Sequence, residues 1–213
     1  MPVKLSSPQA FRIAKYLLKN RVAYQRQIQR DLGLSLGWVN EVISSLYESG
    51  IIKKGKLRRI ELEDPYSLLD LLFWQRPLQH LIEHSIRLEL TNIESIEKEL
   101  YKVCWKAGVK YALTAFSGLM HYLPYYLTFP VVHIYTDDPD KLSKMLQRGR
   151  GPITLEVLRP DFNWILEDSV KVGELSVVDE VQVVIDLFCL GSAGRDAATQ
   201  LYERIGNEQN RTQ

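Results

Sequence analysis

The fold is decided by residues 24–50, which are YQRQIQRDLGLSLGWVNEVISSLYESG. Apolar residues recur at helical spacing on both sides of Gly33. Glycine adopts without strain the left-handed backbone conformation that ends a helix, and Ser35 can cap the amides of the helix that follows. The stretch therefore predicts a helix over Tyr24–Leu32, a turn at the glycine, and a longer helix over Ser35–Ser49.

The sequence on either side of this stretch completes a small domain. Ser7 and Pro8 are a typical helix start, and the apolar spacing that follows predicts a helix ending at Asn20. Downstream, Ile51–Leu62 predicts a basic hairpin that turns at Gly55. Three helices followed by a hairpin predict a winged helix-turn-helix domain.

The two parts of the chain carry opposite charge. Residues 1–62 contain 12 Lys and Arg against 4 Asp and Glu, a balance of +8. Residues 63–213 contain 15 against 22, a balance of −7, so that the net charge of the chain is +1. A basic domain joined to an acidic one predicts two different partners, of which the first is an anion such as double-stranded DNA.

Residues on the longer helix and the hairpin are the candidates for DNA contacts. In a winged helix-turn-helix domain the second helix of the helix-turn-helix motif enters the major groove, where the edges of the four base pairs can be distinguished. Lys and Arg side chains contact the phosphates. The exposed face of the predicted helix has no Lys or Arg, so base contacts are limited to small polar residues and Trp38, which can equally be a packing residue. The predicted DNA-binding residues are Arg26, Arg30, Ser35, Trp38, Asn40, Ser44, Lys53, Lys54, Lys56, Arg58 and Arg59.

Residues 63–90 are predicted to be a mostly helical connector, interrupted at Pro77. Within it, His80-Leu-Ile-Glu-His84 matches the H-x-x-E-H pattern of inverted zinc peptidases, in which two histidines share a helix face. That chemistry needs a further carboxylate ligand, and a pattern with three fixed positions arises readily by chance. The favoured interpretation is that these histidines are not metal ligands, and no metal or cofactor is predicted.

Residues 91–205 predict a small α/β domain with helices packed on a short sheet. Strands are expected over Val109–Thr114, Val131–Thr136, Ile153–Leu158 and Val170–Val178. Helices are expected from Ile93 to near Gly108 and over Ala115–Tyr122, Pro139–Arg148, Asp179–Leu190 and Arg195–Ile205. The polar tail over residues 206–213 is expected to fray. The fold class is therefore α+β (mixed α/β), with an N-terminal winged domain followed by this unit.

Several short blocks of the sequence resemble one family. They are Tyr111-Ala-Leu-Thr-Ala-Phe-Ser-Gly, Val131–Tyr135, Arg150-Gly-Pro-Ile-Thr-Leu-Glu-Val-Leu-Arg-Pro, Val178-Asp-Glu-Val-Gln-Val-Val-Ile-Asp-Leu and Gly194-Arg-Asp-Ala-Ala. Together with the winged helix they resemble the AbiEi-type transcriptional regulators, the antitoxins of type IV toxin–antitoxin systems, over residues 8–205. The resemblance implies a DNA-binding head that represses its own operon and a second domain that opposes a nucleotidyltransferase toxin.

Two alternatives stay open at this stage. A divergent nucleotidyltransferase-like enzyme needs a Gly-Ser turn and then two carboxylates alternating on one strand face, so that both reach Mg²⁺. Here Ser117-Gly118 precedes a strand whose alternating positions are His133 and Tyr135, so we expect no enzyme activity. Asp137 and Asp138 follow that strand and point to opposite sides of an extended chain. The other alternative is a scaffold whose winged helix binds protein.

The composition predicts a cytoplasmic protein. Of the 213 residues 46% are apolar, which suffices for a core, and no apolar stretch approaches the roughly 20 residues that span a bilayer. The N-terminus lacks the apolar segment of a signal peptide. Cys104 and Cys189 are expected to be buried or half-buried free thiols. The oligomeric state is not predicted.

Overall fold

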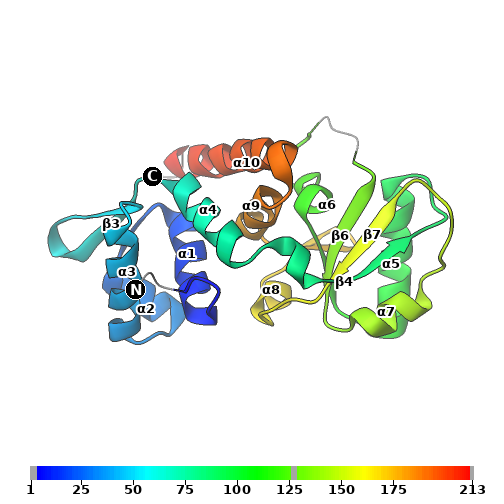
Figure 1. The fold of residues 1–213 in the computed structure, drawn as a ribbon, viewed down its shortest axis with the longest axis horizontal. Helices are drawn as coiled ribbons and strands as arrows, with labels where there is room; N and C mark the ends of the chain where they lie inside the picture. Colours follow the sequence, from blue (N-terminus) through cyan, green and yellow to red (C-terminus); the bar gives the residue numbers. More distant parts are fainter. Residues whose placement is uncertain (1–3, 126–128, 212–213) are drawn as a thin grey trace. The chain divides into compact units, whose positions relative to one another are not determined.

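The computed structural model describes residues 4–125 and 129–211 (Figure 1). It divides into two compact units, Met1–Pro77 and Leu78–Gln213. Residues 1–77 contain 13 Lys and Arg against 7 Asp and Glu (+6), and residues 78–213 contain 14 against 19 (−5), so each unit keeps the charge sign expected from the sequence. Helices and antiparallel or mixed sheets occur in both units, which confirms the predicted α+β class.

The first unit consists of helices on a small sheet. Its elements are α1 (Pro8–Asn20), β1 (Val22–Tyr24), α2 (Gln25–Leu32), α3 (Leu36–Glu48), β2 (Ile52–Lys54), the 3₁₀ turn η1 (Lys56–Arg58), β3 (Arg59–Leu62) and α4 (Pro65–Gln75). Within residues 4–77, β1, β3 and β2 form an antiparallel sheet in that order, with Ala23 opposite Ile60. The helices bury an apolar stripe that includes Leu17, Ile28 and Ile43. This burial of about 1.5–3 kcal/mol per large side chain holds the unit together.

Helix α1 begins directly after Ser7 and ends at Asn20, as expected, although the Ser7 side chain makes no capping hydrogen bond. One local expectation for this unit is wrong. The hairpin does not turn at Gly55, which is extended (φ −102°); it turns through η1, where Leu57 and Arg58 adopt left-handed φ values of 57° and 61°. The backbone N–H of the glycine instead donates to the carbonyl of Arg59 and closes the base of the turn.

The second unit is a mixed sheet between layers of helices. Its elements are η2 (Leu78–Leu81), β4 (Ile82–Arg87), α5 (Ile93–Ala107), β5 (Tyr111–Thr114), α6 (Ala115–Leu119), β6 (Val131–Thr136), α7 (Pro139–Met145), β7 (Thr154–Leu158), α8 (Trp164–Glu167), β8 (Val170–Val172), β9 (Leu175–Val177), α9 (Glu180–Phe188) and α10 (Gly191–Arg211). In the described part, the strands form one sheet of order β4-β7-β6-β5-β9-β8, called here the six-stranded sheet. The pairs β6·β7 and β5·β9 are parallel and the others antiparallel.

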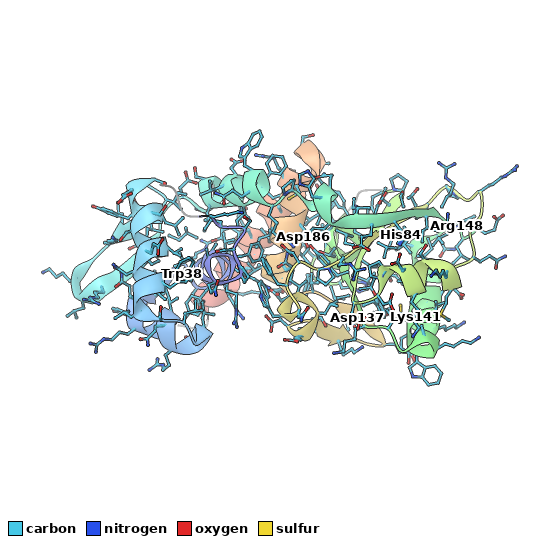
Figure 2. All side chains as sticks on the ribbon, turned by 60° about the horizontal axis from the view of Figure 1, so that its bottom comes forward. Trp38, His84, Asp137, Lys141, Arg148 and Asp186 are labelled. Atoms are coloured by element: carbon cyan, nitrogen blue, oxygen red, sulfur yellow. The ribbon has the colours of Figure 1, made fainter. Side chains whose placement is uncertain are left out.

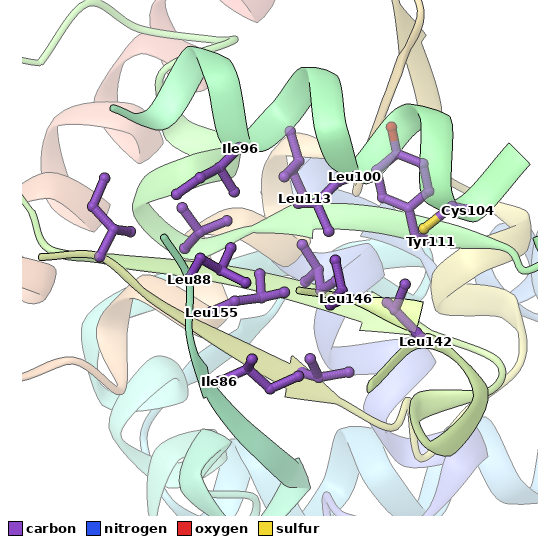
Figure 3. Close-up of a cluster of buried hydrophobic side chains, with 14 of the residues drawn as sticks. Ile86, Leu88, Ile96, Leu100, Cys104, Tyr111, Leu113, Leu142, Leu146 and Leu155 are labelled. Carbon is purple, nitrogen blue, oxygen red and sulfur yellow. The ribbon is translucent and has the colours of Figure 1, made fainter. Parts of the chain in front are cut away.

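The two faces of the six-stranded sheet differ in character. One face packs against α5 and α7 in an apolar cluster that includes Leu100, Leu113, Leu142 and Leu155 (Figure 3). Because side chains alternate along a strand, the neighbouring positions of β5 and β6 lie on the other face, towards α6 and α9. That second face is polar as well as buried.

A buried carboxylate lies at the centre of the polar face. Asp186 of α9 is completely buried and accepts hydrogen bonds from the hydroxyl of Thr114 (2.7 Å), the hydroxyl of Tyr135 (3.1 Å) and Nε2 of Gln182 (3.0 Å) (Figure 2). Burying a polar group costs free energy unless polar partners replace water. These donors come from β5, β6 and α9, so the carboxylate joins all three elements.

The predicted helical connector over residues 63–90 is wrong in its second half. Its first half is α4, which begins where Asp64 accepts a hydrogen bond from the backbone amide of Ser67. Residues 82–87 instead form β4, an edge strand antiparallel to β7 with alternating exposure. The apolar spacing from Leu78 to Ile82 resembles a helix, but pairing with β7 decides the conformation.

The expectation of a frayed tail over residues 206–213 is also wrong within the described chain, because α10 continues to Arg211. The helix begins at Gly191, four positions before the predicted start, and its buried side includes Leu201 and Ile205. Gly194 allows α10 to approach α9 closely, since a Cβ there would lie 2.2 Å from the carbonyl oxygen of Leu187. Packing against α9 therefore explains why α10 is longer than the local sequence predicts.

Two further sequence expectations concern the cysteines and the membrane. Cys104 and Cys189 are both buried and free, which confirms the expected absence of a disulfide between them. Among the described residues, we find no helix whose length and apolarity are sufficient to cross a membrane.

The buried His133 makes the stability of the second unit depend on pH. Burial lowers its pKa from 6.5 to about 4, because the charged imidazolium is poorly solvated there. As the pH falls from about 6.5 to 4, the unfolded chain takes up a proton that the folded chain excludes, so the folded state loses about 3 kcal/mol from this residue.

We predict that His133→Gln, which does not titrate, loses less stability between pH 7 and pH 4 than the unchanged chain. Denaturant unfolding at both pH values measures the difference. Comparing the two proteins removes the contribution of carboxyl groups that titrate in both. Equal losses would show that the imidazole is accessible to protons in the folded state.

Candidate nucleic-acid interface

The turn between α2 and α3 fixes where the first of these helices ends and the second begins. Gly33 ends α2 with a φ of 65°, and a Cβ at this position would meet no atom within 4 Å, so glycine is required by backbone conformation rather than by crowding. Ser35 caps α3, because its Oγ accepts a hydrogen bond from the backbone amide of Trp38 (3.2 Å). The Ser35 hydroxyl, which is one of the predicted DNA-binding groups, therefore already accepts a hydrogen bond within the protein.

Helix α3 has one buried and one exposed face, as its periodicity predicts. Val39 and Ile43 are buried, whereas Asn40 and Glu41 are exposed. Trp38 is half-buried, and its indole Nε1 is buried without a hydrogen-bond partner among the described residues. In this conformation the indole N–H does not face solvent, which favours the packing alternative for this residue.

The hairpin folds back onto α3. Lys54 of β2 donates from Nζ to Oγ of Ser44 (3.2 Å), and its ammonium group lies 4.7 Å from the ring centroid of Tyr47. Both partners belong to α3, so a hairpin cation and the exposed edge of the helix form one surface. Tyr47 is not among the predicted DNA-binding residues; it is half exposed, and its cation–π contact with Lys54 marks it as part of this surface.

Several predicted DNA-binding cations already have acidic neighbours. Lys53 forms an ion pair with Glu63, Arg59 with Glu61 (3.3 Å), and Arg30 with Asp31 (3.6 Å). Exposed pairs of this kind contribute about 0–1 kcal/mol, so a phosphate can displace the carboxylate at small cost. They nevertheless reduce the local positive potential on the hairpin.

Other predicted cations are exposed without such neighbours. Arg26 on α2, and Lys56 and Arg58 in η1, form no ion pair within the part of the chain described here. The two residues of η1 flank Leu57, whose side chain is 89% exposed at the tip of the hairpin. The exposed side chain of Asn40 accepts only a long contact from Nε2 of Gln25 (3.4 Å), which leaves its amide nearly unconstrained.

The second unit does not assemble a two-carboxylate metal site at the positions that the enzyme alternative requires. Ser117 is buried in α6, where its Oγ accepts a hydrogen bond from the backbone amide of His133 (3.2 Å). Asp138 caps α7, and Asp137 accepts a hydrogen bond from the backbone amide of Lys110 (2.9 Å). Asp186 lies elsewhere in the unit (Figure 2) and is completely buried.

Gly118 in the same turn has a packing role. A Cβ there would lie 2.9 Å from Cγ2 of Val183 and 3.3 Å from the carbonyl oxygen of Leu113. The glycine therefore permits α6 to lie against α9 and β5. This close packing accounts for glycine at position 118.

The H-x-x-E-H residues are distributed differently from a peptidase site. His80 lies in η2, whereas Glu83 and His84 lie in β4, so the two histidines do not share a helix face. Glu83, His84 and Asp140 have potential ligand atoms within 4.8 Å of one another. The guanidinium of Arg159 makes two hydrogen bonds to Glu83, and His84 contacts Asp140 (2.9 Å), so these side chains satisfy one another.

The chain matches no protein-family model, and it has no significant match among curated proteins or among solved structures. No family is thereby assigned. A functional conclusion rests on the sequence pattern and on the geometry of the two units.

We predict that Lys56→Ala with Arg58→Ala flattens the salt dependence of DNA binding by nearly two units in the slope of log affinity against log salt. Each phosphate contact releases counterions and contributes about 0.9 to that slope. Fluorescence anisotropy at several salt concentrations measures the change. The matched control is Lys102→Ala with Lys106→Ala on α5, which removes the same charge and leaves the slope as it was. An unaltered slope in the hairpin variant would exclude phosphate contacts by the hairpin tip.

Proposed function

We propose that this chain is a DNA-binding transcriptional regulator whose first unit is a winged helix-turn-helix domain. The observation that carries the proposal is the contact of Lys54 with Ser44 and Tyr47, which joins the basic hairpin to the exposed edge of α3. A helix and a cationic hairpin on one surface match a major groove and its adjacent phosphates.

The proposed binding mode is dominated by phosphates. The exposed face of α3 offers small polar groups and no cation, and Ser35 is already engaged as a helix cap. Asn40 is the residue best suited to discriminate a base, because an asparagine amide can bind both the N6 and N7 positions of adenine. Specificity is therefore modest and depends on few side chains.

We further propose that the chain is the antitoxin of a type IV toxin–antitoxin system, repressing its own operon and opposing a nucleotidyltransferase toxin. The sequence blocks that resemble AbiEi-type regulators support this proposal, as does the balance of −5 in the second unit. An acidic surface favours encounter with a basic partner and disfavours DNA. The proposed location is the cytoplasm, where both the operon and the toxin act.

A DNA-binding assay separates this proposal from the protein-scaffold alternative. The full chain is titrated against labelled DNA from directly upstream of its own gene and against a shuffled sequence of the same length. Tighter binding to the upstream DNA supports the regulator, and Asn40→Ala narrows the difference between the two DNAs. Failure to bind either DNA at low salt would favour the scaffold.

We predict that the hairpin variant Lys56→Ala with Arg58→Ala separates repression from neutralisation. Loss of two phosphate contacts weakens binding to the upstream DNA roughly 10–50-fold at physiological salt. The same variant still relieves the growth arrest caused by the neighbouring toxin in a co-expression assay, because the second unit is unchanged. Loss of rescue by this variant would assign neutralisation to the hairpin surface.

The enzyme alternative has its own test. Purified chain is incubated with Mg²⁺, labelled nucleoside triphosphates and RNA acceptors, and transfer is followed on gels. We expect no transfer. Transfer that is abolished by Asp137→Asn would establish a nucleotidyltransferase in the second unit and contradict the antitoxin assignment.

A further inference from the structure

A pocket of about 310 Å³ opens on the second unit at the end of α5. Its walls come from α5, the start of β5, the end of α8 and the hairpin of β8 and β9. Pockets of about 300–1,000 Å³ are typical of small-molecule sites. All of its lining residues belong to the second unit, whereas DNA binding is proposed for the first.

Aromatic rings form one side of the pocket. Tyr101 and Trp105 are four positions apart on α5, so they lie on the same helix face, and Tyr111 of β5 adds a third ring. Trp105 is 79% exposed although it is a large apolar side chain. A planar ring bound against it would bury that surface and gain stacking energy.

One of the lining residues carries a buried hydroxyl group. Tyr111 lies beside Cys104 (Figure 3), and its hydroxyl is buried without a hydrogen bond of normal geometry to any described residue. Burial raises the pKa of Tyr111, against the smaller opposing effect of the backbone amide of Ser176. The hydroxyl therefore stays protonated and remains available as a donor to a ligand.

The charges of the pocket are positive. Lys110 and Lys171 line it, and none of its described lining residues is a carboxylate, although the unit as a whole has a balance of −5. Lys171 donates to Oγ of Ser176 (2.7 Å), which fixes its ammonium group at the wall. An adjoining pocket, which shares Lys110, is lined by the carboxylates of Asp137 and Glu167.

We propose that this pocket binds a small ligand that joins an aromatic ring to an anionic group, such as a nucleoside monophosphate. The ring stacks on Trp105, and the anion binds the ammonium groups of Lys110 and Lys171. An anion alone leaves the exposed ring of Trp105 uncovered, and a neutral ring leaves the two ammonium groups without an anion. The proposal does not depend on DNA binding or on a toxin.

Calorimetric titration of the full chain tests this pocket with adenosine monophosphate and indole-3-acetate, two aromatic anions from different sources. Adenosine and inorganic phosphate serve as the isolated parts of the nucleotide, and indole and acetate as those of indole-3-acetate. We expect at least one aromatic anion to bind at least tenfold more tightly than either part. Binding of the nucleotide alone assigns the site to nucleotides, and binding of indole-3-acetate alone assigns it to aromatic carboxylates.

Variants at exposed positions locate the binding without disturbing the core. Trp105→Ala and Lys171→Gln each weaken the aromatic anion about tenfold or more, because one removes stacking and the other an ionic hydrogen bond. The matched controls are Trp74→Ala, at an equally exposed tryptophan of α4, and Lys106→Gln, on α5 outside the pocket lining. The proposal is overturned if neither aromatic anion exceeds its parts, or if binding survives both pocket variants unchanged.

Discussion

The second unit depends on the hydrogen bonds that surround the carboxylate of Asp186. Thr114 and Tyr135 reach it from adjacent strands, and Gln182 reaches it from one turn earlier on α9. Removing any donor takes a hydrogen bond from a buried carboxyl oxygen, and removing the carboxyl group takes away the acceptor that these three donors share. The register of β5 against β6 and the position of α9 are therefore fixed together, and α10 is then positioned by its close approach to α9 at Gly194.

The charged groups on the hairpin of the first unit are exposed to water, unlike the buried carboxyl group of Asp186. There the charges are exposed, and water solvates Lys53 and Arg59 whether or not a carboxylate is near. Such pairs exchange partners at little cost, so acidic neighbours regulate the strength of the positive field without preventing contact with an anion. The cations of the hairpin are thus surface groups, whereas the carboxyl group of Asp186 is part of the core of the second unit.

Local sequence signals were sufficient where a conformation is determined within a few residues. The faces of α3 follow from a 3.6-residue period, and the turn at Gly33 follows from the backbone freedom of glycine. The signals failed where a distant partner decides. Strand β1 has only three residues and pairs with β3, and β4 takes its conformation from β7, more than 60 positions later. Nothing local distinguishes these short segments from loop or helix.

The candidate sites, too, could be predicted from the sequence only where their residues are close together in the chain. The cations of the hairpin could be named from composition alone, but their pairing with nearby carboxylates and the contact of Lys54 with Tyr47 required the folded arrangement. The pocket beside Trp105 combines residues of five elements, and its lysines are 61 positions apart. Their spacing in the sequence does not predict that these lysines line one pocket, because they come together only when the six-stranded sheet has formed.

The outer strands of the six-stranded sheet have a consequence for aggregation. At one end β8 has only three residues, and at the other end β4 has a register shift between Ile82 and His84. Short and irregular edges present few aligned main-chain groups to which another strand can add. Open-ended growth of the sheet from copy to copy is therefore disfavoured, and the second unit can expose both edges without becoming a template for fibres.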